Sequence, residues 1–476
     1  MTSFNDKKVL AVDLDGSLIK TDILFESFIL LIKQSPFLII NCLLWLIQGK
    51  AKLKYEISQR VEINHKVLPY NKGVLDLIEK NKYSDEYEKI ILATASNEKY
   101  AKQIAEYLNI EFIASDENNN LKSHNKLKEI QKEYGDRFDY VGDSFADLAI
   151  WAKSETAFVV GNNKVLIKAL RNTNHQNIEI IPRTEKNFFL ILVKSIRVHQ
   201  WSKNLLLFAC LIAAHQFSDF FIFIDLVKAF FAFSFCASSV YLLNDLIDLE
   251  DDRQHHSKQS RPLASGTLSI QIGLCLQPLL LISSLIIAYL ISWQFFIALI
   301  VYFALTTTYS FYLKRIVVLD IVCLASLYLV RIVVGAIVAH LPLTFWFLIF
   351  MLFLFLNLAV LKRYIEIKQS ENHKTSFNKR GYIYDDINLI PPIGFASSYI
   401  SILILALHIN NSVHGSITSH PILIMLLSLI LLYWYTRLWF LANRGKVHED
   451  PVVFVSKDIV SVIIGIVSVL IVYFLT

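Results

Sequence analysis

Three aspartates stand where an apolar segment of the chain ends. Residues 226–243 are apolar enough to cross a membrane, and Asp245, Asp248 and Asp252 follow directly. At about 100° per residue, their side chains fall within roughly 60° of arc on one face of a helix. Like charges at a membrane boundary are costly unless a cation holds them, and Mg²⁺ commonly bridges protein carboxylates to substrate phosphates. We therefore predict a Mg²⁺–phosphate site rather than a solvated acidic helix end.

Basic residues near the ends of the apolar segments could neutralise such phosphates. For each one taken singly, the alternative is a long side chain that reaches to the membrane interface. That alternative explains Arg315 and Arg363 well, but it explains Arg331 poorly, because Arg331 lies deep inside an apolar run. The candidate phosphate anchors are Lys203, Lys258, Arg261, Lys314, Arg331 and Lys362.

A second constellation lies nearer the amino terminus, where three apolar segments typical of strands each end in polar residues. Open α/β sheets bind their ligands at the carboxyl ends of their strands. The ordered set therefore predicts one ligand site at that edge of the sheet. Its members, in chain order, are Asp13, Asp15, Thr94, Lys126, Asp143 and Asp147.

Composition divides the chain into two parts. It is 54% hydrophobic with a mean hydropathy of +0.46, too apolar for one soluble globule of 476 residues. Charged and apolar segments alternate up to about residue 187, as in an α/β domain, and long apolar runs follow. The net charge of +5 gives no reason to expect nucleic-acid binding.

Nine membrane spans are predicted, because the apolar runs approach the spanning length of about 20 residues. Lysine and arginine cluster in the loops of one side, so these loops and the first domain are expected in the cytosol. Residues 187–200 are expected at the interface. The spans are residues 203–216, 226–246, 270–290, 293–311, 317–339, 343–361, 390–410, 420–441 and 456–475.

The segment 28–47 is also apolar, but Lys33-Gln34-Ser35-Pro36 divides it into pieces too short to span. We expect two helices that either rest on the membrane surface or pack within a helical cap over about residues 23–80.

The strand-end residues resemble those of the haloacid-dehalogenase-like (HAD) phosphatases, over about residues 7–170. The resemblance implies that Asp13 is a nucleophile that forms an aspartyl-phosphate, and that Asp15 protonates the leaving oxygen and later activates water. Thr94 and Lys126 would hold the phosphoryl group. The implied Mg²⁺ ligands are Asp13, the Asp15 carbonyl group and Asp143, supported by Asp147.

The pattern N-D-x-x-D-x-x-x-D over residues 244–252 resembles the UbiA-type intramembrane prenyltransferases, whose fold has nine transmembrane helices. The resemblance is closer to one branch, the polyprenyl-phosphate phosphoribosyltransferases of the decaprenylphosphoryl-phosphoribose synthase type. Together, the HAD and UbiA resemblances imply an α/β HAD-like domain (residues 1–170), a linker (171–190) and an all-α UbiA-type bundle (190–476). The matching residues are Arg197, Trp201, Lys203 and Asn204; Arg261 and Pro262; Tyr309, Ser310, Lys314, Leu319 and Asp320; Arg331 and Gly335; and Lys362, Arg363, Tyr364 and Glu366.

The sequence departs from the wider superfamily at the second acidic motif. Aromatic-acceptor prenyltransferases carry D-x-x-x-D there, but Asp320 stands alone because Leu324 occupies the fourth position after it. A single acid favours a donor other than an allylic diphosphate. In the phosphoribosyltransferase branch the donor is phosphoribosyl pyrophosphate and the acceptor is a polyprenyl phosphate. Beside the basic anchors, the candidate substrate contacts are Asn204, Asn244, Tyr309 and Asp320.

The two resemblances together imply a bifunctional enzyme of a bacterial inner membrane, with both active sites on the cytoplasmic side. The membrane domain would transfer 5-phosphoribose to the lipid, and the HAD domain would remove the 5-phosphate, with at least one Mg²⁺ in each domain. The product, polyprenylphosphoryl ribose, would serve cell-envelope assembly. Homo-oligomerisation is left open.

Two rival functions remain. The first is prenylation of an aromatic quinone or haem precursor, which predicts the paired second motif that is absent here. The second is a transporter or receptor with a regulatory HAD domain, which leaves two Mg²⁺–phosphate constellations without an explanation.

Overall fold

The computed structural model describes residues 7–116, 119–173, 175–183, 187–214, 219–256, 258–370, 381–412, 421–447 and 450–475. The chain forms two compact units. The first contains residues 1–196 and 242–276, and the second contains residues 197–241 and 277–476. The chain therefore passes between the units three times, between residues 196 and 197 and within two long helices, α11 (Phe220–Ile247) and α13 (Ile270–Ile291).

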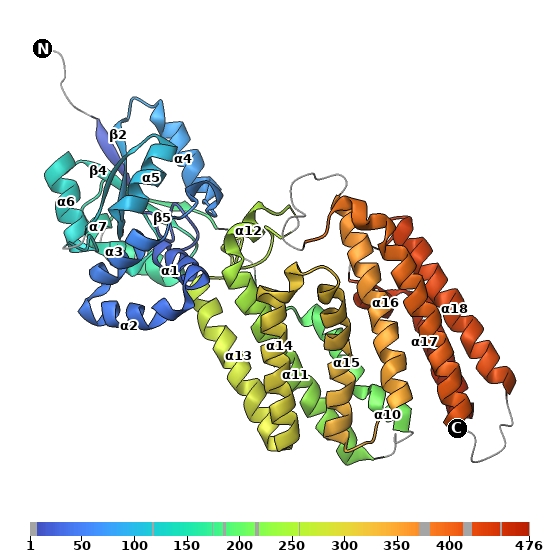
Figure 1. The fold of residues 1–476 in the computed structure, drawn as a ribbon. Helices are drawn as coiled ribbons and strands as arrows, with labels where there is room; N and C mark the ends of the chain where they lie inside the picture. The colour runs from blue at the N-terminus through green and yellow to red at the C-terminus, as the bar shows by residue number, and fades with distance from the viewer. Residues whose placement is uncertain are drawn as a thin grey trace, which may run out of the picture. The chain divides into compact units, whose positions relative to one another are not determined.

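The first unit contains a six-stranded parallel sheet of order β3-β2-β1-β4-β5-β6 (Figure 1). Residues 171–190, which the sequence analysis assigned to a linker, include β6, and β6 pairs with β5. The strands are β1 (Lys8–Val12), β2 (Tyr87–Asn97), β3 (Glu111–Ser115), β4 (Phe138–Gly142), β5 (Ala157–Val160) and β6 (Ile178–Ile181).

Helices cover both faces of this sheet, because successive side chains of a strand point to opposite faces. In β1, Leu10 and Val12 pack with α4 (Lys72–Lys82) and α5 (Glu98–Leu108). Val9 and Ala11 belong to the core on the opposite face. That core also contains residues of α6 (His124–Tyr134), α7 (Leu148–Trp151) and α8 (Lys164–Arg171).

Three helices inserted after β1 form a cap with its own small core. Leu31, Cys42 and Ile57 meet in that core, one from each helix. The expected division of the apolar segment 28–47 is confirmed, because a short 3-10 turn (Pro36–Leu38) separates the first two helices. The helices are α1 (Ile23–Gln34), α2 (Ile39–Gln48) and α3 (Lys50–Arg60).

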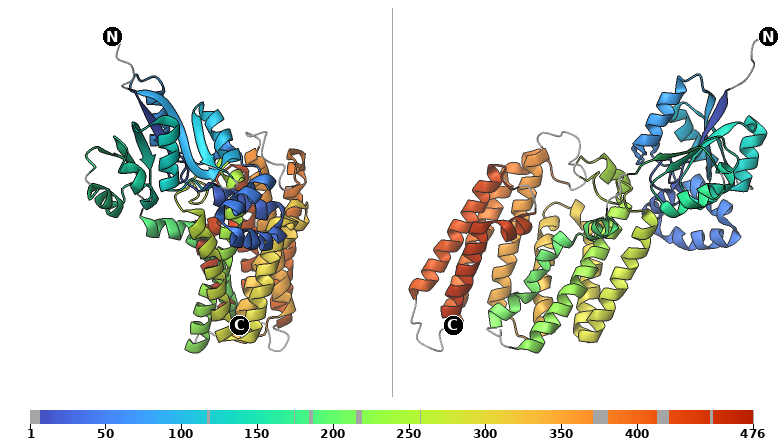
Figure 2. Two further views of the ribbon diagram at one scale, coloured as in Figure 1. Left: turned by 90° about the vertical axis from the view of Figure 1, so that its left-hand side faces the viewer. Right: turned by 180° about the vertical axis from the view of Figure 1, so that it is seen from behind.

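The second unit is helical, and α14 to α18 pack each against the next (Figures 1 and 2). It begins with a 3-10 segment, η4 (Val198–Phe208), and a short helix, α10 (Ala209–Ala214). The longer helices are α14 (Trp293–Phe311), α15 (Leu319–Ala339), α16 (Phe345–Ser370), α17 (Ile390–Ser412), α18 (Pro421–Asn443) and α20 (Ile459–Leu475), the last preceded by α19 (Pro451–Lys457).

Among the described residues, seven helices are long and apolar enough to cross a membrane, or eight if α19 and α20, which are bent by 82°, form one span. The prediction of nine spans is therefore not confirmed. The difference concerns residues 203–216, where η4 and α10 replace one regular helix and residues 215–218 lie outside the described part.

Candidate functional site

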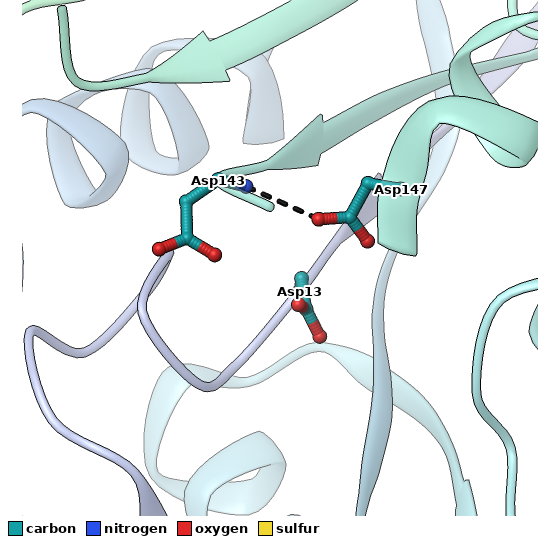
Figure 3. Close-up of side chains that lie close together, drawn as sticks. All are labelled: Asp13, Asp143 and Asp147. Carbon is teal, nitrogen blue, oxygen red and sulfur yellow. Dashed lines mark hydrogen bonds between the residues drawn. The ribbon is translucent and has the colours of Figure 1, made fainter. Parts of the chain in front are cut away.

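The carboxyl ends of β1 and β4 bring three aspartates together. These neighbouring parallel strands end at one edge of the sheet, so Asp13 lies beside Asp143 and Asp147. Each offers one carboxylate oxygen, and the three atoms lie within 4.8 Å of one another (Figure 3). No other group of three acidic, histidine or cysteine residues in the described chain meets this distance. A Cβ atom on Gly16, whose φ is +77°, would lie 2.3 Å from the Asp143 carboxylate, so glycine is required there.

Burial raises the pKa values of Asp13 and Asp143 to about 7 each, because an apolar surrounding disfavours the charged form. A bound cation would offset the free-energy cost of burying these charged carboxylates. A set of three carboxylates fits Mg²⁺, which prefers oxygen ligands.

Lys126 closes a buried network around these aspartates. Its Nζ lies 2.7 Å from Asp13 Oδ1 and 3.0 Å from the Tyr140 hydroxyl oxygen. The Tyr140 hydroxyl in turn donates to Asp147 Oδ1 at 3.0 Å. Lys126 is only 3% exposed, so its charge is held against Asp13 instead of being solvated.

Asp15 lies beside this group with both of its carboxylate oxygens hydrogen-bonded. Oδ1 accepts from the Ile23 backbone N–H at 2.8 Å, and Oδ2 accepts from the Ser96 hydroxyl at 2.6 Å. Burial first, and then the charge of Asp22, raise the pKa of Asp15 to about 6, so this carboxyl group can carry a proton close to neutral pH. Thr94 is fully buried near the end of β2, where its Oγ1 accepts from the Ser96 N–H at 3.0 Å.

The sequence analysis missed Lys54, which α3 of the cap brings to this site. Its Nζ donates to the Ala95 carbonyl oxygen at 2.6 Å, one residue after Thr94. Burial lowers the pKa of Lys54, while the charges of Asp15 and Asp22 act in the opposite direction. A partly buried cation carried by the cap suits an anionic substrate. The only signal for it in the sequence is the alternating run of lysines over residues 50–54.

The acidic motif lies at the end of α11. Asp245 is in its last turn, Asp248 interrupts the helix, and Asp252 belongs to α12 (Leu249–Gln254). The continuous helix that was predicted is therefore broken. Its hydrogen bonding nevertheless continues, because the Asp248 N–H donates to the Asn244 carbonyl oxygen at 2.9 Å.

Arg261 joins two carboxylates of this motif. Its Nη1 lies 3.0 Å from Asp245 Oδ1 and 2.6 Å from Asp252 Oδ2. Lys258 Nζ lies 4.0 Å from Asp252 Oδ1. Asp245 and Asp252 thus converge on one cationic nitrogen, and a pair of buried carboxylates of this kind also fits Mg²⁺.

The segment that carries the acidic motif is bound to the cap within the first unit. Arg253 forms a bidentate ion pair with Glu26 of α1, at 3.1 and 2.5 Å, and both side chains are buried. Lys33 of α1 lies 3.4 Å from Asp251. Nothing in the sequence linked residues 26 and 253.

In the second unit, two of the candidate phosphate anchors share one carboxylate. Lys203 Nζ lies 2.9 Å from Asp450 Oδ2, and Lys362 Nζ lies 2.7 Å from the same atom. The Tyr328 hydroxyl donates to Asp450 Oδ1 at 3.1 Å. Asp450 was not a candidate in the sequence analysis, because a single aspartate before Pro451 is a common way to begin a helix.

Arg331 is buried in the same unit among neutral partners. It donates to Asn204 Oδ1 at 3.0 Å, to the Tyr302 hydroxyl at 2.9 Å and to the Leu327 carbonyl oxygen. The guanidinium group and Lys203 Nζ both lie over the Tyr328 ring, at 5.5 and 5.8 Å from its centroid.

The cluster of Lys203, Arg331, Lys362 and Asp450 therefore carries an excess of positive charge. Within the described residues, Asp450 is the only carboxylate that contacts any of these three cations, so three positive charges face one negative charge. Cations inside a membrane protein are costly unless they are paired. This cluster therefore has the electrostatics of an anion-binding site.

Asp320 is buried and already paired. Arg363 Nε lies 2.5 Å from its Oδ2, and the Tyr309 hydroxyl donates to its Oδ1 at 2.7 Å. Arg363 was expected to reach the membrane interface, but it is completely buried and also contacts Glu366, so that interpretation was wrong. The sequence did not reveal a partner 43 residues away. Lys314 lies in the 3-10 turn Leu313–Arg315, before Asp320.

The sequence profile of the UbiA prenyltransferase family matches residues 205–457. The chain belongs to the UbiA prenyltransferase family. With seven long apolar helices among its described residues, this UbiA-family chain is a multi-pass membrane protein. Family membership also makes it a transferase.

Individual relatives match different shares of the chain. The uncharacterized protein y4nM of Sinorhizobium fredii is 32% identical over 466 residues, which cover 97% of this chain and 90% of that protein. The decaprenyl-phosphate phosphoribosyltransferase of Mycolicibacterium smegmatis is 37% identical over 200 residues, 41% of this chain and 62% of that enzyme. A solved UbiA homologue from Archaeoglobus fulgidus, bound to GPP and Mg²⁺, is 17% identical, with a TM-score of 0.45 over 60% of this chain and 97% of that one.

Proposed function

We propose that the protein transfers 5-phosphoribose from phosphoribosyl pyrophosphate to a polyprenyl phosphate, and that its first domain is a HAD-like phosphatase that then removes the 5-phosphate. The product is polyprenylphosphoryl ribose. Both substrates and the intermediate carry phosphates, which agrees with the two acidic constellations and the buried cations.

The cationic cluster of Lys203, Arg331, Lys362 and Asp450 is the observation that carries the transferase proposal. Its excess positive charge calls for an anionic ligand, and a phosphate group supplies one. The similarity to a decaprenyl-phosphate phosphoribosyltransferase supports the choice of substrates, although it covers less than two thirds of that enzyme. The burial of Asp320 against Arg363 also argues against a second metal-binding acid.

In the proposed transfer, an oxygen of the lipid phosphate attacks C1 of the ribose while the bond from C1 to pyrophosphate breaks. Asp245, Asp248 and Asp252 would hold Mg²⁺, which supplies charge neutralisation for the departing pyrophosphate. Arg261, which contacts two of these aspartates, would be displaced toward a phosphate oxygen. The lipid phosphate is already anionic, so the transfer needs no strong base.

In the proposed phosphatase, Asp13 attacks the phosphorus atom and the bond to the ribose 5-oxygen breaks, with Asp15 donating a proton to that oxygen. Asp15 then takes a proton from the water that hydrolyses the aspartyl-phosphate. Lys126 and Thr94 would hold the phosphoryl oxygens, and Lys54 would bind the anionic remainder of the substrate. Asp13, Asp143 and Asp147 would hold Mg²⁺, because their carboxylate oxygens lie within 4.8 Å of one another. Carrying both activities on one chain raises the effective concentration of the second site.

The assay that tests the proposal offers the purified protein two substrate pairs. One pair is phosphoribosyl pyrophosphate with polyprenyl phosphate, and the other is geranylgeranyl diphosphate with 4-hydroxybenzoate. We expect ribose-linked lipid from the first pair only. Turnover of the second pair alone would establish an aromatic prenyltransferase instead.

A further inference from the structure

The cap carries an apolar surface that its own core does not use. In α2, the side chains of Cys42 and Trp45 face the core shared with α1 and α3. At about 100° per residue, Ile40, Leu43 and Ile47 fall on the opposite side of the helix. Their exposed fractions are 63%, 61% and 83%. Phe37, at the start of the same segment, is 88% exposed.

This surface consists of Phe37, Ile40, Leu43, Leu44 and Ile47, which are all exposed and, within α2, lie at helical spacing on one side. Single exposed apolar residues are common on proteins, but clusters of this size mark interaction sites.

We propose that α2 docks the cap onto the lipid headgroup region of the membrane. The helix has ten residues, about 15 Å, and therefore covers only half of the hydrocarbon thickness of about 30 Å. It is too short to span a bilayer but long enough to lie in its surface. Docking itself does not depend on the proposed function, although its effect on turnover does.

The charges around α2 suit a membrane surface. Lys50 and Lys52 follow the helix, and Lys33 precedes it; Lys33 also pairs with Asp251, and Lys52 also pairs with Glu56. Apolar helices flanked by lysine bind at the boundary of acyl chains and anionic headgroups. Asn41 and Gln48 are the only polar residues within the helix.

The first unit also contains a direct link from the cap to a membrane-spanning helix. Glu26 and Lys33 of α1 pair with Arg253 and Asp251, which follow the end of α11 by a few residues. Only the turn at residues 35–38 separates α1 from α2. A bilayer is therefore within reach of α2 in every molecule, whereas a separate partner protein would have to be recruited.

Fluorescence quenching in the full-length protein tests the docking. A Leu44→Cys variant, with Cys275 and Cys323 replaced by serine, is labelled and placed in nanodiscs of phosphatidylcholine and phosphatidylglycerol. A Lys80→Cys variant, on exposed α4, is the matched control. We expect nitroxide-bearing lipids to quench the label at residue 44 and iodide to quench the label at residue 80. Iodide quenching at residue 44 would overturn the proposal, and so would protection from both quenchers, which indicates cover by protein such as a second copy.

A triple variant, Ile40→Ser, Leu43→Ser and Ile47→Ser, links docking to turnover. We expect it to lose lipid quenching and to hydrolyse p-nitrophenyl phosphate as the parent does, while hydrolysis of the lipid-linked 5-phosphate falls at least about tenfold. Retained lipid quenching in this variant would overturn the assignment of α2. If Asp13→Asn leaves lipid dephosphorylation unchanged, the proposed phosphatase fails, and the quenching result still decides the docking.

Discussion

At the scale of single residues, the two constellations differ in how much of their charge is balanced. In the sheet domain, Asp13, Asp143 and Asp147 face two cations, Lys126 at 2.7 Å from Asp13 and Arg183 at 3.6 Å from Asp143, so negative charge is in excess. In the membrane domain, Asp450 pairs with Lys203 and Lys362, and Arg331 contacts neutral groups among the described residues, so positive charge is in excess. The first arrangement suits a cation and the second an anion, and each can be tested by changing one charge.

Asp13→Asn should abolish phosphatase activity and leave phosphoribosyl transfer intact, because only the proposed nucleophile is lost. The 5-phosphorylated lipid should then accumulate, which mass spectrometry of the lipid products would measure. The substitution keeps the size of the side chain, so the fold should persist. Dephosphorylated lipid at the normal rate would show that the domain acts on another substrate.

Asp450→Asn should destabilise the membrane domain, because it leaves Lys203 and Lys362 without their shared counter-ion. Breaking a buried ion pair typically costs about 3–5 kcal/mol. We expect a lower midpoint of thermal unfolding, recovered in part by the double variant with Lys362→Met. A midpoint that does not change in the single variant would contradict the charge argument.

At the scale of elements, the pairing of α1 with the segment after the acidic motif is the least expected feature of the first unit. The Glu26–Arg253 pair is buried and bidentate, so it fixes the segment that carries Asp252 and Arg261 relative to the cap. This pairing ties the cap to the segment that carries the acidic motif.

Glu26→Gln should therefore lower transfer as well as stability, because Arg253 stays buried without a charged partner. Glu26→Gln combined with Arg253→Met should recover stability relative to the single variant, and the double-mutant cycle measures the coupling energy. Glu56→Gln, which breaks the surface pairs of Glu56 with Lys52 and Arg60 on α3, is the matched control and should change little. Equal effects of Glu26→Gln and the control would refute the coupling.

At the scale of the whole molecule, the two proposed activities should separate by substitution but share a need for Mg²⁺. Asp245→Ala should abolish lipid-linked ribose formation and leave hydrolysis of p-nitrophenyl phosphate unchanged. Removal of divalent cations with EDTA should stop both reactions, and added Mg²⁺ should restore them. Near-normal transfer by Asp245→Ala would disprove the role of the acidic motif.

The sequence was sufficient for features that depend on local patterns. Apolar patterns located three of the six strands, most of the long helices and the break within residues 28–47, because burial requires those patterns wherever they occur. Motif spacing likewise singled out Asp13, Asp143 and Asp147, since parallel strands place their carboxyl ends at one edge.

Contacts between distant residues were decided only by the tertiary structure. The contact of Lys126 with Asp13, 113 residues away in the chain, is one of these. Glu26 pairs with Arg253, 227 residues away, and Arg363 pairs with Asp320, 43 residues away. Patterns within a short stretch of sequence cannot predict contacts between residues so far apart. Asp450 and Lys54 were missed for the same reason: a single charged side chain acquires a function only from the charges that the fold brings to it.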